Sequence, residues 1–264
     1  MFDFITNLKT RNETLFYFGL VCLIASLIFL VLSRLTTTQV YNVSAWYKPF
    51  KFAFSSFLFA WAMGWYCHYL TNFNSSLFNW ATIVLLGFEV AYIALQAGRG
   101  QLSHYNLSTP IYSALYSMMA LAASAITVYT AYICVLFFIN DFPSLPTYYV
   151  WAIRLGILLF VVFSFEGFVM GSRLTHTIGG PDGGEGITFL GWSTKFGDPR
   201  IAHFIGMHAL QVLPILSFYV IKNTKATIVL SILYGFLAVF TLVQALKGKP
   251  LVKSKTKEQK EVIQ

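Results

Sequence analysis

The sequence predicts an all-α protein, an integral membrane bundle of seven transmembrane helices. Three observations support this. Of the 264 residues, 57% are hydrophobic and 11% are charged, whereas a soluble domain carries about 25% charged residues. The apolar residues gather into stretches of roughly 20, the length of helix that crosses a hydrocarbon core. Backbone groups in lipid must pair within their own segment, and the short alternating segments of a β-barrel are absent from the sequence.

The seven helices are expected, in chain order, over residues 14–33, 50–70, 77–98, 110–138, 148–170, 200–221 and 227–246. The first follows Lys9 and Arg11, as a signal peptide would. It lacks a small-residue cleavage pattern, so we expect it to remain a membrane helix. Pro49 suits the first turn of the second helix, and Thr109 suits the cap of the fourth. Pro214 predicts a kink in the sixth.

Positive charge is distributed unevenly along the chain. The net charge is +8, and six lysines lie in segment 247–264, after the last predicted helix. We expect residues 1–246 to form one transmembrane domain and 247–264 to be a disordered cytoplasmic tail that contacts anionic lipid headgroups. Seven spans place the termini on opposite sides, and the N-terminal side receives four Lys and Arg residues. The excess of Lys and Arg on the other side predicts an external N-terminus and a cytoplasmic C-terminus. We expect the membrane to be a bacterial inner membrane, and we expect no nucleic-acid partner.

Three charged residues fall well inside the predicted spans, away from their first two residues: Glu89, Arg154 and Glu166. A charge inside the bilayer costs about 2.5–3.5 kcal/mol on insertion scales, which favours a functional role. We expect Arg154, near a helix end, to extend its side chain toward water. Burial of the two glutamates without complete pairing would suit them to proton transfer.

Polar residues follow one face of the third helix. Glu89, Tyr92, Gln96 and Arg99 are spaced by three, four and three residues, which places them in one stripe facing the bundle interior. Glu166 shares a face with Arg173 on the fifth helix by the same spacing.

The two glutamates and the arginines Arg99 and Arg173 form the predicted catalytic set. In the alternative interpretation, Glu89–Arg99 and Glu166–Arg173 are structural ion pairs that tie helices together.

Four of the five histidines lie on the predicted cytoplasmic side, near the glycine-rich loop 179–186. The loop lacks the glycine patterns of nucleotide-binding sites. His176, His203, His208 and Asp182 are the predicted metal ligands, for a single zinc or iron ion. His203 and His208 are five residues apart and point in different directions on a regular helix, so one ion held by both requires an irregular helix. The alternative is that each histidine is hydrogen-bonded to a neighbouring helix.

A haem b is the other candidate cofactor. Two axial histidines on different helices suffice, and His208 with His104 or His176 can supply them. Gln96 and Gln211, which share helix faces with site residues, complete the predicted cofactor-binding set. The chain has too few histidines for a membrane di-iron site, and residues 227–246 contain no lysine for a retinal Schiff base.

The segments 176–184 and 197–211, and to a lesser extent 96–106, resemble a family of uncharacterised bacterial polytopic membrane proteins of the seven-helix type. No activity is assigned to that family, so the resemblance implies a membrane fold and no mechanism.

Three functions fit the sequence. The first is a membrane-embedded, metal- or haem-dependent enzyme that acts on a lipophilic substrate, with arginines holding an anionic group. The second is a transporter or channel for a small solute or protons, with Glu89 and Glu166 as relay groups. The third is a non-catalytic membrane assembly partner. The sequence does not determine the oligomeric state.

Overall fold

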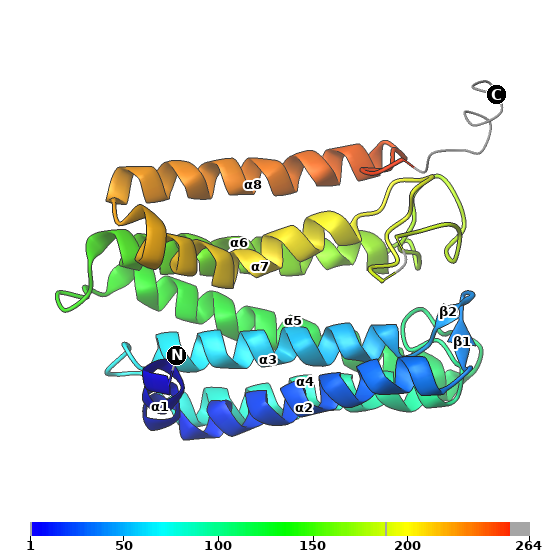
Figure 1. Cartoon of the computed structure of the whole chain (residues 1–264), viewed down its shortest axis with the longest axis horizontal. Helices are drawn as coiled ribbons and strands as arrows, with labels where there is room; N and C mark the ends of the chain where they lie inside the picture. The colour runs from blue at the N-terminus through cyan, green and yellow to red at the C-terminus, as the bar shows by residue number, and fades with distance from the viewer. Residues whose placement is uncertain (1, 188, 254–264) are drawn as a thin grey trace.

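The computed structural model describes residues 2–187 and 189–253. Its elements are α1 (Phe2–Arg11), α2 (Glu13–Leu35), β1 (Gln39–Val40), β2 (Val43–Ser44), α3 (Tyr47–Cys67), α4 (Ser75–Gly98), α5 (Pro110–Ile139), α6 (Thr147–Gly171), α7 (Arg200–Leu216), the π-helix η1 (Ser217–Ile221) and α8 (Thr224–Leu246). Figure 1 shows the long helices running between the same two ends of one bundle. The all-α prediction is confirmed for the described residues, with one small hairpin added.

Six helices are long and apolar enough to cross a membrane: α2, α4, α5, α6, α7 continued by η1, and α8. Each of the seven predicted stretches is helical, except that the second ends at Cys67 and not at residue 70. This second helix is α3, which runs beside α2 (Figure 1). However, α3 is less apolar than the other six, because it carries two lysines and several Tyr and Trp residues. The structure therefore supports a membrane bundle with six candidate crossings, while the predicted count of seven depends on α3.

Polar caps define where several helices begin. The side chains of Asn12, Asn74, Thr109 and Asn223 each accept a hydrogen bond from the backbone N–H three residues later. The predicted cap at Thr109 is confirmed. Pro214 lies inside α7, and the π-helical turn η1 follows within one turn, because a proline removes a backbone donor and disturbs the hydrogen-bond ladder.

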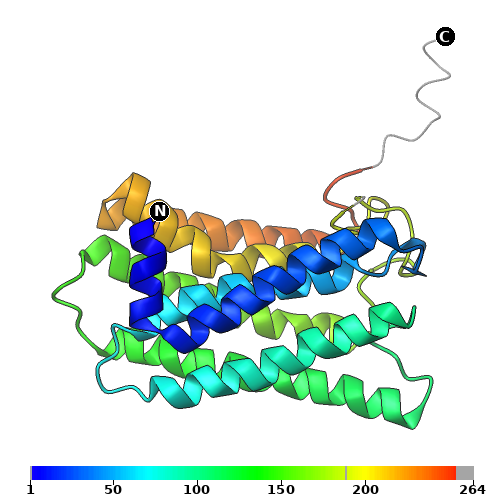
Figure 2. The same ribbon diagram turned by 60° about the horizontal axis from the view of Figure 1, so that its bottom comes forward.

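Helix α1 and the hairpin β1–β2 were not predicted. Helix α1 lies across the end of the bundle (Figure 2), where the Arg11 guanidinium sits 3.7 Å from the Trp65 ring centroid and donates a hydrogen bond of 2.8 Å to the Tyr69 hydroxyl. The strands β1 and β2 form an antiparallel hairpin. Its two turn residues, Tyr41 and Asn42, have φ angles of 55° and 60°, as a two-residue hairpin turn requires.

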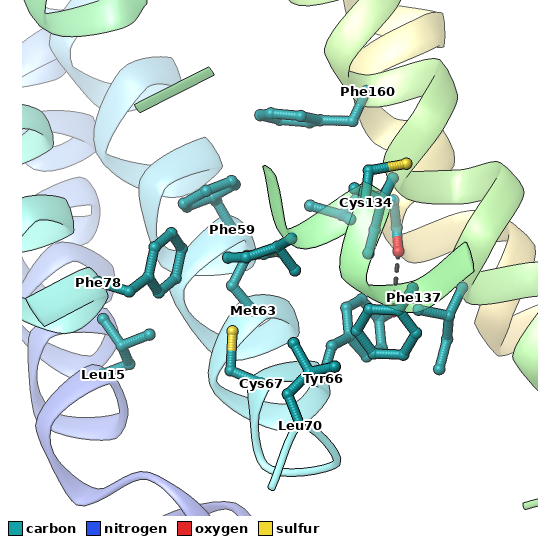
Figure 3. Packing of buried hydrophobic residues seen from close by; sticks show 14 of the residues in the cluster. Leu15, Phe59, Met63, Tyr66, Cys67, Leu70, Phe78, Cys134, Phe137 and Phe160 are labelled. Atoms are coloured by element: carbon teal, nitrogen blue, oxygen red, sulfur yellow. Dashed lines mark hydrogen bonds between the residues drawn. The ribbon is translucent and has the colours of Figure 1, made fainter. Parts of the chain in front are cut away.

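The largest apolar core fills the half of the bundle that contains α1. Figure 3 shows part of this core from close by. It is built by the last turns of α3 and α5, the first turns of α2, α4 and α6, and one residue of α7. Met63, Phe78 and Phe137 are fully buried there. The hydroxyl of Tyr66, although buried in this core, donates a hydrogen bond of 2.8 Å to the carbonyl of Leu210.

Arg154 lies at this end of the bundle, as expected. Its side chain does not only extend toward water, as expected, but is also bound to the protein. Its Nε donates a hydrogen bond of 2.7 Å to the carbonyl of Phe137, and its Nη2 donates one of 3.1 Å to the carbonyl of Asn140. These contacts satisfy carbonyls at the end of α5.

The domain boundary predicted after residue 246 coincides with the last residue of α8. Of the basic tail, residues 254–264 lie outside the described part of the chain, so the prediction of disorder is not addressed there.

Candidate functional site

Most of the polar residues singled out from the sequence, though not Arg154, gather in the half of the bundle opposite α1. We call that end of the bundle the loop end. It comprises the hairpin β1–β2, the connections 99–109 and 172–199, and the end of α8 (Figures 1 and 2). His104 lies in the first connection, His176 in the second, and His203 in the first turn of α7. The prediction placed four histidines at one end of the bundle with the glycine-rich loop; it is confirmed for these three, whereas His208 lies further along α7.

The described residues of the connection 172–199 form a ribbon that is paired with itself. Ile178 and Gly197 exchange backbone hydrogen bonds of 2.9 and 3.1 Å, and Gly186 pairs with Ser193 further along. The ribbon packs against the end of α8 so closely that a Cβ atom on Gly197 would overlap the carbonyl oxygen of Ala245. Glycine at this position therefore allows the ribbon to cover the bundle.

Asp182 holds the first half of the ribbon. Its carboxylate accepts hydrogen bonds of 3.0 Å from both the backbone N–H and the ring Nδ1 of His176, and one of 2.8 Å from the Thr175 hydroxyl. Burial would raise the pKa of Asp182, but the hydrogen bonds from His176 outweigh it and hold that pKa well below its usual range.

Asp198 holds the second half of the ribbon in the same way. Its side chain is fully buried, and it accepts hydrogen bonds from the backbone N–H groups of Ser193 and Arg200 and from the Arg200 guanidinium. The same guanidinium donates to the carbonyl of Gly191. Since its charge is neutralised by Asp198, Arg200 acts mainly as a structural clamp between α7 and the ribbon.

Glu166 and His203 meet across the α6–α7 interface. The Oε2 atom of Glu166 lies 3.4 Å from Nδ1 of His203, and the glutamate side chain is only 5% exposed. Gly167 makes this approach possible, because a Cβ atom there would lie 3.2 Å from Cε1 of His203. Both carboxylate oxygens of Glu166 and Nδ1 of His203 are buried without a hydrogen-bond partner in the described structure.

The histidines in the two connections are held neutral. Burial lowers the pKa of His104 well below its usual range, and the nearby positive charge of Lys48 and the histidines His176 and His203 lower it further. Burial also lowers the pKa of His176, to about 4, although the Asp182 carboxylate opposes the change. With its Nδ1–H donated to Asp182, the neutral ring of His176 has Nε2 as its unprotonated nitrogen.

The predicted stripe on α4 is confirmed for three of its four members. Glu89, Tyr92 and Gln96 are buried, whereas Arg99, at the end of the helix, is exposed. Arg173, after the end of α6, is exposed as well. Among the described residues, neither arginine lies within ion-pair distance of a carboxylate, so the alternative of structural pairs Glu89–Arg99 and Glu166–Arg173 is wrong.

The predicted metal ligands do not come together as one set. Within the described ranges, no three His, Cys, Asp or Glu side chains are grouped as a metal ion would require. His176 contacts Asp182, His203 contacts Glu166, and Nδ1 of His208 lies 3.3 Å from the Gln211 side chain on its own helix. The regular helix around His203 and His208 explains their separation, since the π-helical turn begins only after both. His208 and Gln211 do share a face, as expected.

Three contributors to the site were not singled out from the sequence as site residues: Lys48, Lys51 and Tyr105. Lys51 donates a hydrogen bond of 2.8 Å to the carbonyl of Leu190, and the Tyr105 and His176 rings lie 4.8 Å apart. The signal available in the sequence was the pair of lysines in the first two turns of a long aromatic helix.

Comparison of the chain with models of protein families, with curated proteins and with solved structures found no match in any of the three. The function must therefore be inferred from the chemistry of the loop end.

Proposed function

We propose that the protein is a membrane-embedded enzyme that uses Glu166 and His203 for acid–base catalysis on a lipophilic substrate. The observation that carries the proposal is the buried Glu166 carboxylate, which has no hydrogen-bond partner in the described structure and lies 3.4 Å from a histidine nitrogen that also has none. Buried polar groups are normally paired, and unpaired ones concentrate where function requires them.

The pair has the properties that general acid–base catalysis needs. A histidine and a carboxylate at this separation can exchange a proton after a small movement, directly or through one water molecule. The His203 side chain is 31% exposed and Glu166 is 5% exposed, so the histidine is the member that a substrate can reach. In the proposed reaction, His203 accepts a proton from the substrate or donates one to it. Glu166 orients the imidazole ring and stabilises its protonated form.

The distribution of polar groups favours an enzyme over a carrier. The buried polar residues of the site lie in the half of the bundle nearest the loop end, while the opposite half is filled by the large apolar core of Figure 3. A solute carrier needs binding groups that become accessible from both sides. Polar groups confined to one end of a bundle whose other half is packed with apolar side chains are better suited to chemistry on a molecule that reaches them from that end or from lipid.

The charges around the site favour a substrate with an anionic group. Lys48 and Lys51 lie in the first two turns of α3, and in the described structure neither has a carboxylate within ion-pair distance. Arg200 is already engaged by Asp198. We therefore assign the binding of an anionic headgroup to the two lysines, in place of Arg99 and Arg173.

The metal- or haem-dependent form of the enzyme stays a prediction with less support, because the expected ligands are separated. Elemental analysis and an absorption spectrum of the purified protein test it directly. A proton-coupled carrier is the second candidate, favoured by Glu89, another buried glutamate with an unpartnered oxygen among the described residues. The proposal keeps seven crossings, with α3 as the seventh, a cytoplasmic loop end and an external N-terminus.

The experiment compares lipid extracts of membranes that contain the native protein, Glu166→Gln or Glu185→Gln. Glu185 is a matched control, since it lies in the ribbon with a side chain that is 62% exposed. We expect a lipophilic product, detected by mass spectrometry, with the native protein and Glu185→Gln and not with Glu166→Gln. If the three extracts are the same, the enzymatic proposal fails, and proton uptake by proteoliposomes then tests the carrier.

A further inference from the structure

Helix α4 carries a second set of buried polar groups, apart from the Glu166–His203 pair. Glu89, Tyr92 and Gln96 have exposures of 7%, 5% and 0%. One oxygen of each side chain, Oε1 of Glu89, the hydroxyl of Tyr92 and Oε1 of Gln96, is buried without a hydrogen-bond partner in the described structure. Three such atoms therefore lie in a row on one face of α4.

This row of oxygens starts at the loop end and runs inward. Gln96 lies in the last turn of α4, where its Nε2 donates 3.0 Å to the carbonyl of Leu102 in the connection 99–109, so its side chain is anchored beside that connection. Tyr92 follows one turn deeper, in an apolar cluster with Ile93 and with Met119 of α5. Glu89 is the innermost member.

The spacing of the three residues suits bridging water. Steps of four and three residues along a helix correspond to about 6 and 4.5 Å, which one water molecule with two hydrogen bonds can span. A buried polar atom left unpaired destabilises the fold, and buried water usually makes about three hydrogen bonds to such atoms.

We propose that Glu89, Tyr92 and Gln96 line a chain of ordered water that carries protons between the loop end and a protonated Glu89. Glu89 has no cationic side chain within ion-pair distance in the described ranges, so a proton is the partner that removes its charge in the membrane interior. In each exchange, the Glu89 carboxyl gives its proton to the adjacent water and receives another from it. The Tyr92 hydroxyl can both donate and accept, so it can pass the proton along.

This proposal does not rest on the acid–base role of Glu166. It assigns a proton-storage site and its access route to α4, whichever reaction the Glu166–His203 pair performs.

Infrared spectroscopy of the purified protein in an ester-free detergent tests it. We expect a carboxylic acid C=O band that is lost in Glu89→Gln and kept in Glu13→Gln, which changes an exposed glutamate at the other end of the bundle. After transfer to D₂O the band should shift rapidly in the native protein. In Tyr92→Phe or Gln96→Leu the shift should be slower by about tenfold, the effect of losing one hydrogen bond from the path.

Tyr132→Phe is the matched control for Tyr92→Phe, because Tyr132 is 53% exposed on α5. Thermal unfolding establishes that each variant is folded. The two path variants, Tyr92→Phe and Gln96→Leu, change different residues, so if one does not fold the other still tests the path. The proposal is overturned if no band is lost in Glu89→Gln, if the native band does not exchange, or if exchange is equally fast in both path variants and the control.

Discussion

The carboxylate of Asp182 binds both the backbone N–H and the ring Nδ1 of His176, each at 3.0 Å. One side chain thereby fixes the position of the glycine-rich ribbon and the tautomer of the histidine. Asp182 was a reasonable candidate metal ligand from the sequence, but both of its oxygens are used for hydrogen bonds inside the ribbon.

We expect Asp182→Asn to destabilise the protein. The amide presents donors where the carboxylate presented acceptors, so at least one hydrogen bond to His176 is lost, at a cost of about 2 kcal/mol for a bond to a charged group. Thermal unfolding in detergent measures the change, with Glu185→Gln as the control for an exposed acid in the same ribbon. Equal unfolding temperatures for Asp182→Asn and the native protein would contradict this role.

Stability should fall as the pH falls below about 7. The folded-state pKa of His176 is lowered to about 4 from an ordinary 6.5, so between these values the unfolded chain binds a proton that the folded chain excludes. Stability is therefore complete above pH 6.5 and declines toward pH 4, by on the order of 3 kcal/mol. His104 acts in the same direction, and Asp182, whose pKa is lowered, removes further stability at still lower pH. Unfolding temperatures from about pH 8 to about pH 4 measure the slope, which should be shallower in His176→Gln.

Gly197→Ala should loosen the ribbon from α8. The added methyl group would overlap the carbonyl oxygen of Ala245, and overpacking of this kind costs about 1–3 kcal/mol. The expected result is faster tryptic cleavage after Lys195, an exposed residue of the ribbon, together with a lower unfolding temperature. Gly184→Ala is the control, since the nearest atom to its added methyl is 4.0 Å away. Equal cleavage of the two variants would argue against tight packing at Gly197.

Membrane topology can be tested with single cysteines on either side of α3. Val43 and Thr71 are both exposed, at opposite ends of that helix. We expect a membrane-impermeant maleimide to label Thr71→Cys on intact cells, and Val43→Cys only after the cells are opened. The native protein is the background control, because Cys22, Cys67 and Cys134 are buried. Labelling of both positions from the same side would mean that α3 does not cross.

Much of the fold could be predicted because short stretches of sequence are enough to identify membrane helices. Apolar runs, Thr109 as a cap and the end of α8 all follow from short stretches of sequence, since a helix in lipid satisfies its own backbone. Helix α1 escaped prediction because it is short and its stability comes from Arg11 packing on Trp65, a contact 54 residues distant in the chain.

The sequence by itself determined that polar chemistry gathers at one end of an apolar bundle, because residues three or four apart on a helix must share a face and loops of known order must alternate between ends. Only the tertiary structure decided which groups meet there. It paired His203 with Glu166 and His176 with Asp182, separated His208 from both, and left Arg99 and Arg173 on the surface. These outcomes depend on how helices rotate against one another and on the path of a glycine-rich ribbon, and no local pattern encodes either.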